Sequence, residues 1–119
     1  MSRILIAGKD WAARALLRAQ LLEEGIDVEA CEDVPTAVQV LWARDVMPGL
    51  LVADVSQSDD LAKDISMLSQ WAKHLPIWIL AGHIGPGAEP LEGGGFERII
   101  FRPIDMGKLV KEIQERLAD

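Results

Sequence analysis

The sequence predicts an α/β fold in which five parallel strands form one sheet with helices on both of its faces. Short apolar runs of strand length alternate along the chain with segments whose apolar residues recur every three or four positions. The chain has 119 residues, and 50% of them are hydrophobic, which suits one domain with one core. We therefore expect a doubly wound sheet rather than a helical bundle or a sandwich.

The first strand and helix are predicted within residues 4–24. Residues 4–7 form a continuous apolar run, which is typical of a strand buried on both faces. Residues 10–24 follow with the period of a helix, and Gly25 is suited to end that helix. The apolar stripe of the helix consists of Ala13, Leu16, Leu17 and Leu21.

The second and third units follow the same pattern. Residues 27–31 alternate apolar and polar side chains, as an edge strand with one solvent-exposed face does. Asp33 can then cap a helix that reaches Trp42. Residues 50–53 are the third strand, and apolar residues at steps of three and four predict a helix over about residues 59–75.

The last two strands are predicted at residues 77–81 and 98–101. Asp105 can cap a final helix that extends to Leu117. The segment between the two strands, residues 82–95, is rich in glycine, which disfavours a helix. We therefore expect the fourth helix to be short or irregular.

Charge and composition exclude several classes of protein. The chain has 12 Lys plus Arg against 19 Asp plus Glu, so its net charge of −7 repels nucleic-acid phosphates and anionic membranes. A single cysteine, Cys31, permits neither a disulfide nor a cysteine metal site within the chain. The apolar run near the N-terminus is too short for a signal peptide or a membrane span. We expect one cytoplasmic domain, residues 1–119, that binds neither nucleic acid nor membrane.

Polar residues gather where the predicted strands end. Right-handed crossovers bring the carboxyl ends of all parallel strands to one edge of the sheet, and ligands of such folds bind at that edge. Two carboxylates and two cations are expected to converge there. The residues that leave the strands at this edge are Gly8, Lys9, Asp10, Asp54, Ala81, Gly82, Arg102 and Pro103.

Four segments of the chain occur in the order and spacing typical of receiver domains of two-component signalling proteins. These are Ile4-Leu5-Ile6 with the polar triplet after it, residues 48–54, residues 76–82 and Phe101-Arg102-Pro103. Over essentially its whole length the chain resembles a divergent response-regulator receiver domain. The resemblance implies a CheY-like, flavodoxin-like sheet with strand order 2-1-3-4-5. It also implies that Asp54 is the phosphoacceptor and that acids after the first strand hold Mg²⁺.

Several positions depart from the pattern of that family. The acidic pair expected after the first strand falls on Gly8 and Lys9, which leaves Asp10 as the nearby carboxylate. The hydroxyl residue expected after the fourth strand falls on Ala81. The lysine that precedes a cis-type proline in the family falls on Arg102, which keeps the charge but not the compact ammonium.

The charges of this pocket predict weak metal binding. Mg²⁺ is held through carboxylates and retained waters, but here Asp10 and Asp54 are offset by Lys9 and Arg102. Lys9 could pair with Asp54 in place of the metal. No cofactor and no enzymatic activity are expected, and Mg²⁺ binding should be weak or absent. The predicted function is an atypical receiver that signals through protein contacts, with weak or no Mg-dependent phosphorylation at Asp54.

The expected partner is a sensor histidine kinase or another signalling protein, and a homodimer also remains open. In receivers the face made by the fourth helix, fifth strand and fifth helix commonly binds the partner. Here Ile99 occupies a position where receivers often place a switching aromatic, and the adjoining helix is doubtful. Docking could therefore use the helix over residues 10–24 instead.

Other interpretations remain open at this point. The chain could be an ordinary phosphoacceptor that uses Asp10 and Asp54, or, less favoured, a flavodoxin-like cofactor-binding protein. Asp54 could cap a loop, Asp10 could cap a helix, and Lys9 could be a solvated lysine. His74 and His83 lack further metal ligands nearby in the sequence. We expect the four tryptophans to be packing residues; they are Trp11, Trp42, Trp71 and Trp78.

Overall fold

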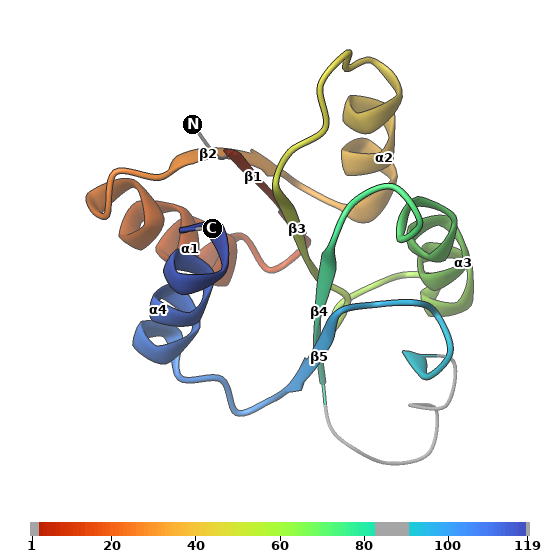
Figure 1. The fold of residues 1–119 in the computed structure, drawn as a ribbon. Coiled ribbons are helices and arrows are strands. Elements are labelled where there is room, and N and C mark those ends of the chain that lie inside the picture. Colours follow the sequence, from red (N-terminus) through yellow and green to blue (C-terminus); the bar gives the residue numbers. More distant parts are fainter. Residues whose placement is uncertain (1–2, 83–90, 119) are drawn as a thin grey trace.

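A sheet of five parallel strands forms the centre of the molecule (Figure 1), with strand order β2-β1-β3-β4-β5. The computed structural model describes residues 3–82 and 91–118. Its elements are β1 (Arg3–Gly8), α1 (Trp11–Glu23), β2 (Asp27–Cys31), α2 (Val34–Trp42), β3 (Leu50–Asp54), α3 (Leu61–Trp71), β4 (Ile77–Ala81), β5 (Arg98–Phe101) and α4 (Met106–Leu117). The predicted fold class and strand order are confirmed.

Helices cover both faces of the sheet, as predicted. Figure 1 shows α2 and α3 together on one face and α1 and α4 together on the other. The strand side chains alternate between these two apolar layers, so Leu5 and Leu51 pack toward α2 and α3 while Ile4 and Leu50 pack toward α1 and α4. All four of these side chains are at most 2% exposed, which explains why the first and third strands are apolar throughout.

An aspartate caps the start of each of the four helices found in residues 3–82 and 91–118. The side chains of Asp10, Asp33, Asp60 and Asp105 accept a hydrogen bond from the backbone N–H three residues ahead, at 3.1, 2.8, 3.1 and 3.1 Å. The cap predicted at Asp33 and the one predicted at Asp105 are confirmed. No helix within the two described ranges is long and apolar enough to cross a membrane.

Two helical predictions need correction or qualification. The third helix was expected to continue to Leu75, but α3 ends at Trp71 and the chain continues as a turn. Pro76 disfavours the helical conformation of the residue before it, and Leu75 is buried in the core outside the helix. Between β4 and β5, residues 91–97 contain no α-helix, and residues 83–90, where His83 falls, lie outside the described residues.

The tryptophans differ in their burial, so the prediction that all of them are packing residues is wrong in part. Trp78 is 2% exposed and belongs to the core, but Trp11 and Trp42 are 70% and 75% exposed. Trp42 makes an edge-to-face contact with Trp71 at 5.2 Å between ring centroids. Trp11, Trp42 and Trp71 lie at the ends of helices. Hydrophobic periodicity does not distinguish a buried from an exposed aromatic residue at the margin of an apolar stripe.

Polar contacts tie β5 and the chain before it to α4. Glu97 accepts hydrogen bonds from the Trp78 indole at 2.7 Å and from Arg116 at 2.9 and 3.0 Å. Arg98 pairs with Glu112 and lies over the Trp78 ring, 4.7 Å from its centroid. The hydrogen bonds from Arg116, helped by the one from Trp78, hold the pKa of Glu97 below its ordinary value of 4.5, although partial burial opposes this.

Replacing Glu97 by Gln should therefore reduce stability in a pH-dependent way. Because the folded pKa of Glu97 is lowered, its contribution is fully present above about pH 4.5 and is lost as the pH falls through the folded value. We expect Glu97→Gln to lower the urea midpoint near pH 7, with a deficit that shrinks as the pH falls below 4.5. Glu115→Gln, on an exposed residue of α4, is the control; a deficit of Glu97→Gln that does not change with pH would contradict this assignment.

Candidate functional site

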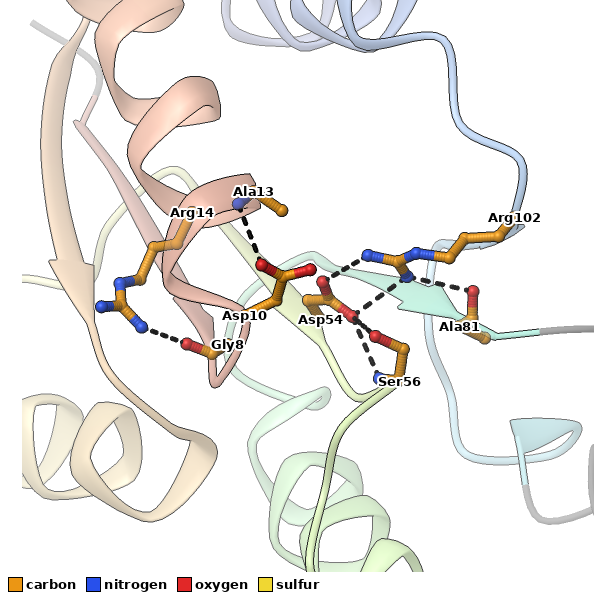
Figure 2. A network of polar contacts seen from close by, with 8 residues as sticks. All are labelled: Gly8, Asp10, Ala13, Arg14, Asp54, Ser56, Ala81 and Arg102. Carbon is orange, nitrogen blue, oxygen red and sulfur yellow. Dashed lines mark hydrogen bonds and ion pairs between the residues drawn. The ribbon is translucent and has the colours of Figure 1, made fainter.

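The predicted site residues come together at the carboxyl edge of the sheet (Figure 2). Gly8 ends β1 and Asp54 ends β3, and the parallel register places the two residues directly opposite each other. Ala81 ends β4, and Arg102 follows β5. The right-handed crossovers thus bring four separate segments of the chain to one edge, as the topology predicted.

The Asp54 carboxylate is held by the guanidinium of Arg102. The Arg102 Nη2 donates to Asp54 Oδ2 at 2.7 Å, and Nη1 donates to Oδ1 at 3.2 Å and to the Ala81 carbonyl at 3.3 Å. The side chains of Arg102 and Asp54 are 27% and 11% exposed, so the pair is largely shielded from water. The hydrogen bond from Arg102 to Asp54 raises the pKa of the guanidinium, with further contributions from the charges of Asp54 and Asp10 against the opposing effect of burial.

The backbone beside Arg102 fixes the direction of this side chain. The Arg102 N–H donates to the carbonyls of Gly82 and Ala81 at 2.9 and 3.2 Å, which anchors the end of β5 to the end of β4. The peptide bond between Arg102 and Pro103 is cis, as expected for the family that the chain resembles. These contacts place the Arg102 guanidinium over the end of the sheet, where Asp54 lies.

Ser56 is a second partner of the Asp54 side chain that sequence reasoning did not single out. Its backbone N–H and its hydroxyl donate to Asp54 Oδ1 at 3.0 and 2.7 Å. This is an Asx-type turn, in which a carboxylate binds the chain two residues ahead, and the spacing Asp-x-Ser is its only signal in the sequence. Asp54 therefore caps its own loop as well as pairing with Arg102.

Lys9 does not pair with Asp54, so that prediction is wrong. Its ammonium instead pairs with Asp59 in the loop before α3, and this hydrogen bond raises the pKa of Lys9. Both residues are exposed, so the Lys9 ammonium remains accessible to water. Arg102, and not Lys9, lies beside Asp54.

Asp10 lies at the start of α1 and acts there as the N-cap. Its Oδ1 accepts from the Ala13 N–H at 3.1 Å, and one turn further along the helix Arg14 donates to the carbonyl of Gly8. Figure 2 shows the Asp10 carboxylate between the start of this helix and the Asp54–Arg102 pair. The role as helix cap is confirmed.

The side chains at this edge do not fit Mg²⁺. The ion binds carboxylate and carbonyl oxygens and needs net negative charge nearby. Both oxygens of Asp54 accept hydrogen bonds from Arg102, and one oxygen of Asp10 is used by the cap. In the described part of the chain, no group of three or more His, Cys, Asp or Glu side chains is arranged to hold a metal ion.

Comparison with solved structures identifies the architecture. The receiver domain of the Francisella response regulator 1452 matches with a TM-score of 0.80 at 17% identity, over 99% of this chain and 98% of that one. The CheY-like receiver domain protein of Methanospirillum hungatei JF-1 matches with a TM-score of 0.81 at 18% identity, over 99% and 94% of the two chains. The chain has the receiver-domain fold.

The receiver fold is evident from the structure but not from close sequence relatives. No protein-family model matches the sequence, and no curated protein matches it significantly. The response regulator TrrA of Thermotoga maritima, solved in complex with Mg²⁺ and BeF, matches with a TM-score of 0.75 at 17% identity, over 98% of this chain and 100% of that one. At these low identities the matches show a shared fold alone. The chemistry at the carboxyl edge of the sheet follows from the residues present there.

A side chain at position 8 should destabilise this receiver fold. A Cβ built on Gly8 would lie 2.9 Å from the Cβ of Asp54, an atom next to the backbone that has little freedom to move. We expect Gly8→Ala to cost about 1–3 kcal/mol of unfolding free energy. Gly82→Ala is the matched control, because a Cβ there meets nothing within 4 Å. Equal unfolding free energies for the two variants would contradict the predicted clash.

The coupling between Asp54 and Arg102 can be measured by a double-mutant cycle. Arg102→Met leaves a shielded carboxylate without its main partner and should cost about 2–3 kcal/mol, and the coupling energy with Asp54→Asn should be about 1–3 kcal/mol. The matched control is the exposed pair, with Lys9→Met and Asp59→Asn, for which the coupling should be much smaller. If the coupling energy of Asp54 with Arg102 is as small as that of Lys9 with Asp59, the Asp54–Arg102 pair stabilises the fold no more than an exposed ion pair does.

Proposed function

We propose that this chain is an atypical receiver that signals through protein contacts, with weak or no Mg-dependent phosphorylation at Asp54. The observation that carries the proposal is the two-pronged hydrogen bonding of the Asp54 carboxylate by Arg102. The structures that match this fold are receiver domains of response regulators, and this favours a role in two-component signalling over catalysis of its own.

The engaged carboxylate is a poor phosphoryl acceptor. For Asp54 to become phosphorylated, one of its oxygens must form a bond to phosphorus while the donor's leaving group departs. Here Oδ2 accepts from Arg102, and Oδ1 accepts from Arg102 and from Ser56. If Arg102 moved from the carboxylate to the incoming phosphoryl group, it would lose both of its hydrogen bonds to Asp54. The side chains at the carboxyl edge of the sheet would then have to rearrange.

The remaining edge residues supply little of the charge stabilisation that this transfer needs. Phosphoryl transfer depends on cations and donors that neutralise the oxygens of the transferred group. TrrA was solved with Mg²⁺ and BeF, but here Gly8 and Lys9 occupy the positions where the resemblance implies metal-binding acids. Ala81 has no hydroxyl to donate. Asp10 and Asp54 are left as a weak metal site at most.

Protein contacts remain available to such a domain. A sensor histidine kinase or another signalling protein in the cytoplasm is the proposed partner, and a second copy of the chain is the alternative. On α1 the side chains of Trp11 and Leu22 are 70% and 43% exposed, and their spacing of eleven residues puts them on one side of the helix. This exposed apolar surface supports the idea that α1 contributes to docking.

Phosphorylation by a small phosphodonor tests the proposal. We expect wild type, incubated with Mg²⁺ and acetyl phosphate, to gain little mass in intact-mass spectrometry, and Asp54→Asn to match it. Lys9→Asp restores one acid at an exposed position and should increase Mg-dependent phosphorylation by roughly tenfold, whereas the neutral control Lys9→Asn should not.

The opposite result identifies an ordinary receiver. Rapid and complete gain of one phosphoryl group by wild type, absent in Asp54→Asn, would support the alternative in which Asp10 and Asp54 alone form a working metal site. That result would overturn the proposal, because the Arg102 contact would then be no barrier to transfer.

A further inference from the structure

A cavity of about 460 Å³ opens beside Asp54, between α1, the sheet and the loop that leads into α4. Its volume falls within the range of sites that bind small molecules. The walls are mainly apolar, and the large apolar side chains that line it are Ile6, Leu17, Val52, Leu80, Ile104 and Met106.

Small residues along one wall leave this space open. Gly8 lines the cavity from β1, and Ala13 lines it from the first turn of α1. A side chain at Gly8 would require a shift, because its Cβ would lie 2.9 Å from the Cβ of Asp54. Because Ala13 lines the cavity, a larger side chain at that position is expected to fill it.

The charged residues at the cavity differ in how far their hydrogen bonds are satisfied. Both oxygens of Asp54 and both terminal nitrogens of Arg102 are engaged with each other, and Ser56 and the Ala81 carbonyl also take part. Arg14 donates to the backbone at Gly8. Asp10 uses Oδ1 for the helix cap, and its Oδ2 accepts no hydrogen bond from residues 3–82 or 91–118.

We propose that this cavity binds a small molecule that has an apolar body and a protonated amine. The apolar body would occupy the space between Leu17, Val52 and Leu80, and the ammonium would donate to Asp10 Oδ2. Figure 2 shows the Asp10 carboxylate facing the Asp54–Arg102 pair, at the polar end of this edge. A cation is favoured over an anion because Arg102 is paired with Asp54, Arg14 is held at the Gly8 carbonyl, and Asp10 Oδ2 is the lining carboxylate oxygen that accepts no hydrogen bond from the described residues.

This inference goes beyond the proposed function and does not depend on it. A ligand in the cavity would contact the start of α1 and the loop after β5, which are the segments that carry Asp10 and Arg102. Its binding would be measurable whether or not Asp54 accepts a phosphoryl group. Phosphorylation and ligand binding are therefore separate properties of the same edge.

Matched probes of one shape test the charge preference. Phenethylamine, 2-phenylethanol and 3-phenylpropionate carry an aromatic body with a cationic, neutral or anionic end, and their dissociation constants can be measured by NMR titration of the full chain. We expect phenethylamine to bind wild type at least about tenfold more tightly than the other two, because its hydrogen bond to Asp10 is charge-assisted. Equal binding of the three probes, tighter binding of the anion, or no binding by any of them would overturn the proposal.

Variants test the location of binding. Asp10→Asn removes the charge but retains a good helix cap, and it should weaken phenethylamine binding by about tenfold. Ala13→Leu should fill the cavity and abolish binding, while Ala15→Leu, exposed on the same helix, should bind as wild type does. Thermal unfolding would verify that all three variants are folded. Undiminished binding by folded Ala13→Leu or by Asp10→Asn would overturn the assignment.

Discussion

The pairing of Asp54 with Arg102 is the constraint on which the carboxyl edge of this sheet depends. It connects β3 to the segment after β5 across the end of β4, so three strands share one polar contact. The pair is largely shielded from water, and a shielded charge is costly without its partner. Neither residue can change alone without leaving the other uncompensated, and the chemistry open to Asp54 is limited by the same contact.

The fold could be predicted because its determinants are local and repeated. Continuous apolar runs identify the inner strands, the alternation of residues 27–31 identifies an edge strand, and aspartate caps mark helix starts. Each of these signals is read within a few residues. The end of α3 was misplaced because apolar periodicity continues to Leu75, which is buried in the core although the helix has ended at Trp71.

The candidate site could be predicted as a location but not as a set of contacts. Topology alone brings Asp54 and Arg102 to the same edge, and the sequence order of the strands is enough to show it. Which cation meets which carboxylate depends on side-chain direction and hydration, and these are not encoded by spacing. Lys9 precedes α1 on an exposed loop and reaches Asp59, whereas the backbone hydrogen bonds of Arg102 aim its guanidinium at Asp54. The hydrogen bonds from Ser56 to Asp54 could not be predicted, because the spacing Asp-x-Ser is their only signal in the sequence.

Gly8, Asp54 and Arg102 form one coupled arrangement at the carboxyl edge of the sheet. A Cβ at position 8 would lie 2.9 Å from the Cβ of Asp54, so a side chain there would require a local shift between β1 and β3. With no acid at that position to compete for it, Arg102 can engage both oxygens of Asp54, which a compact ammonium could not do with the same geometry. The missing side chain at Gly8 also contributes to the cavity beside Asp54. The close approach of β3 to Gly8 thus disfavours a side chain at that position, next to the Asp54–Arg102 pair and the cavity.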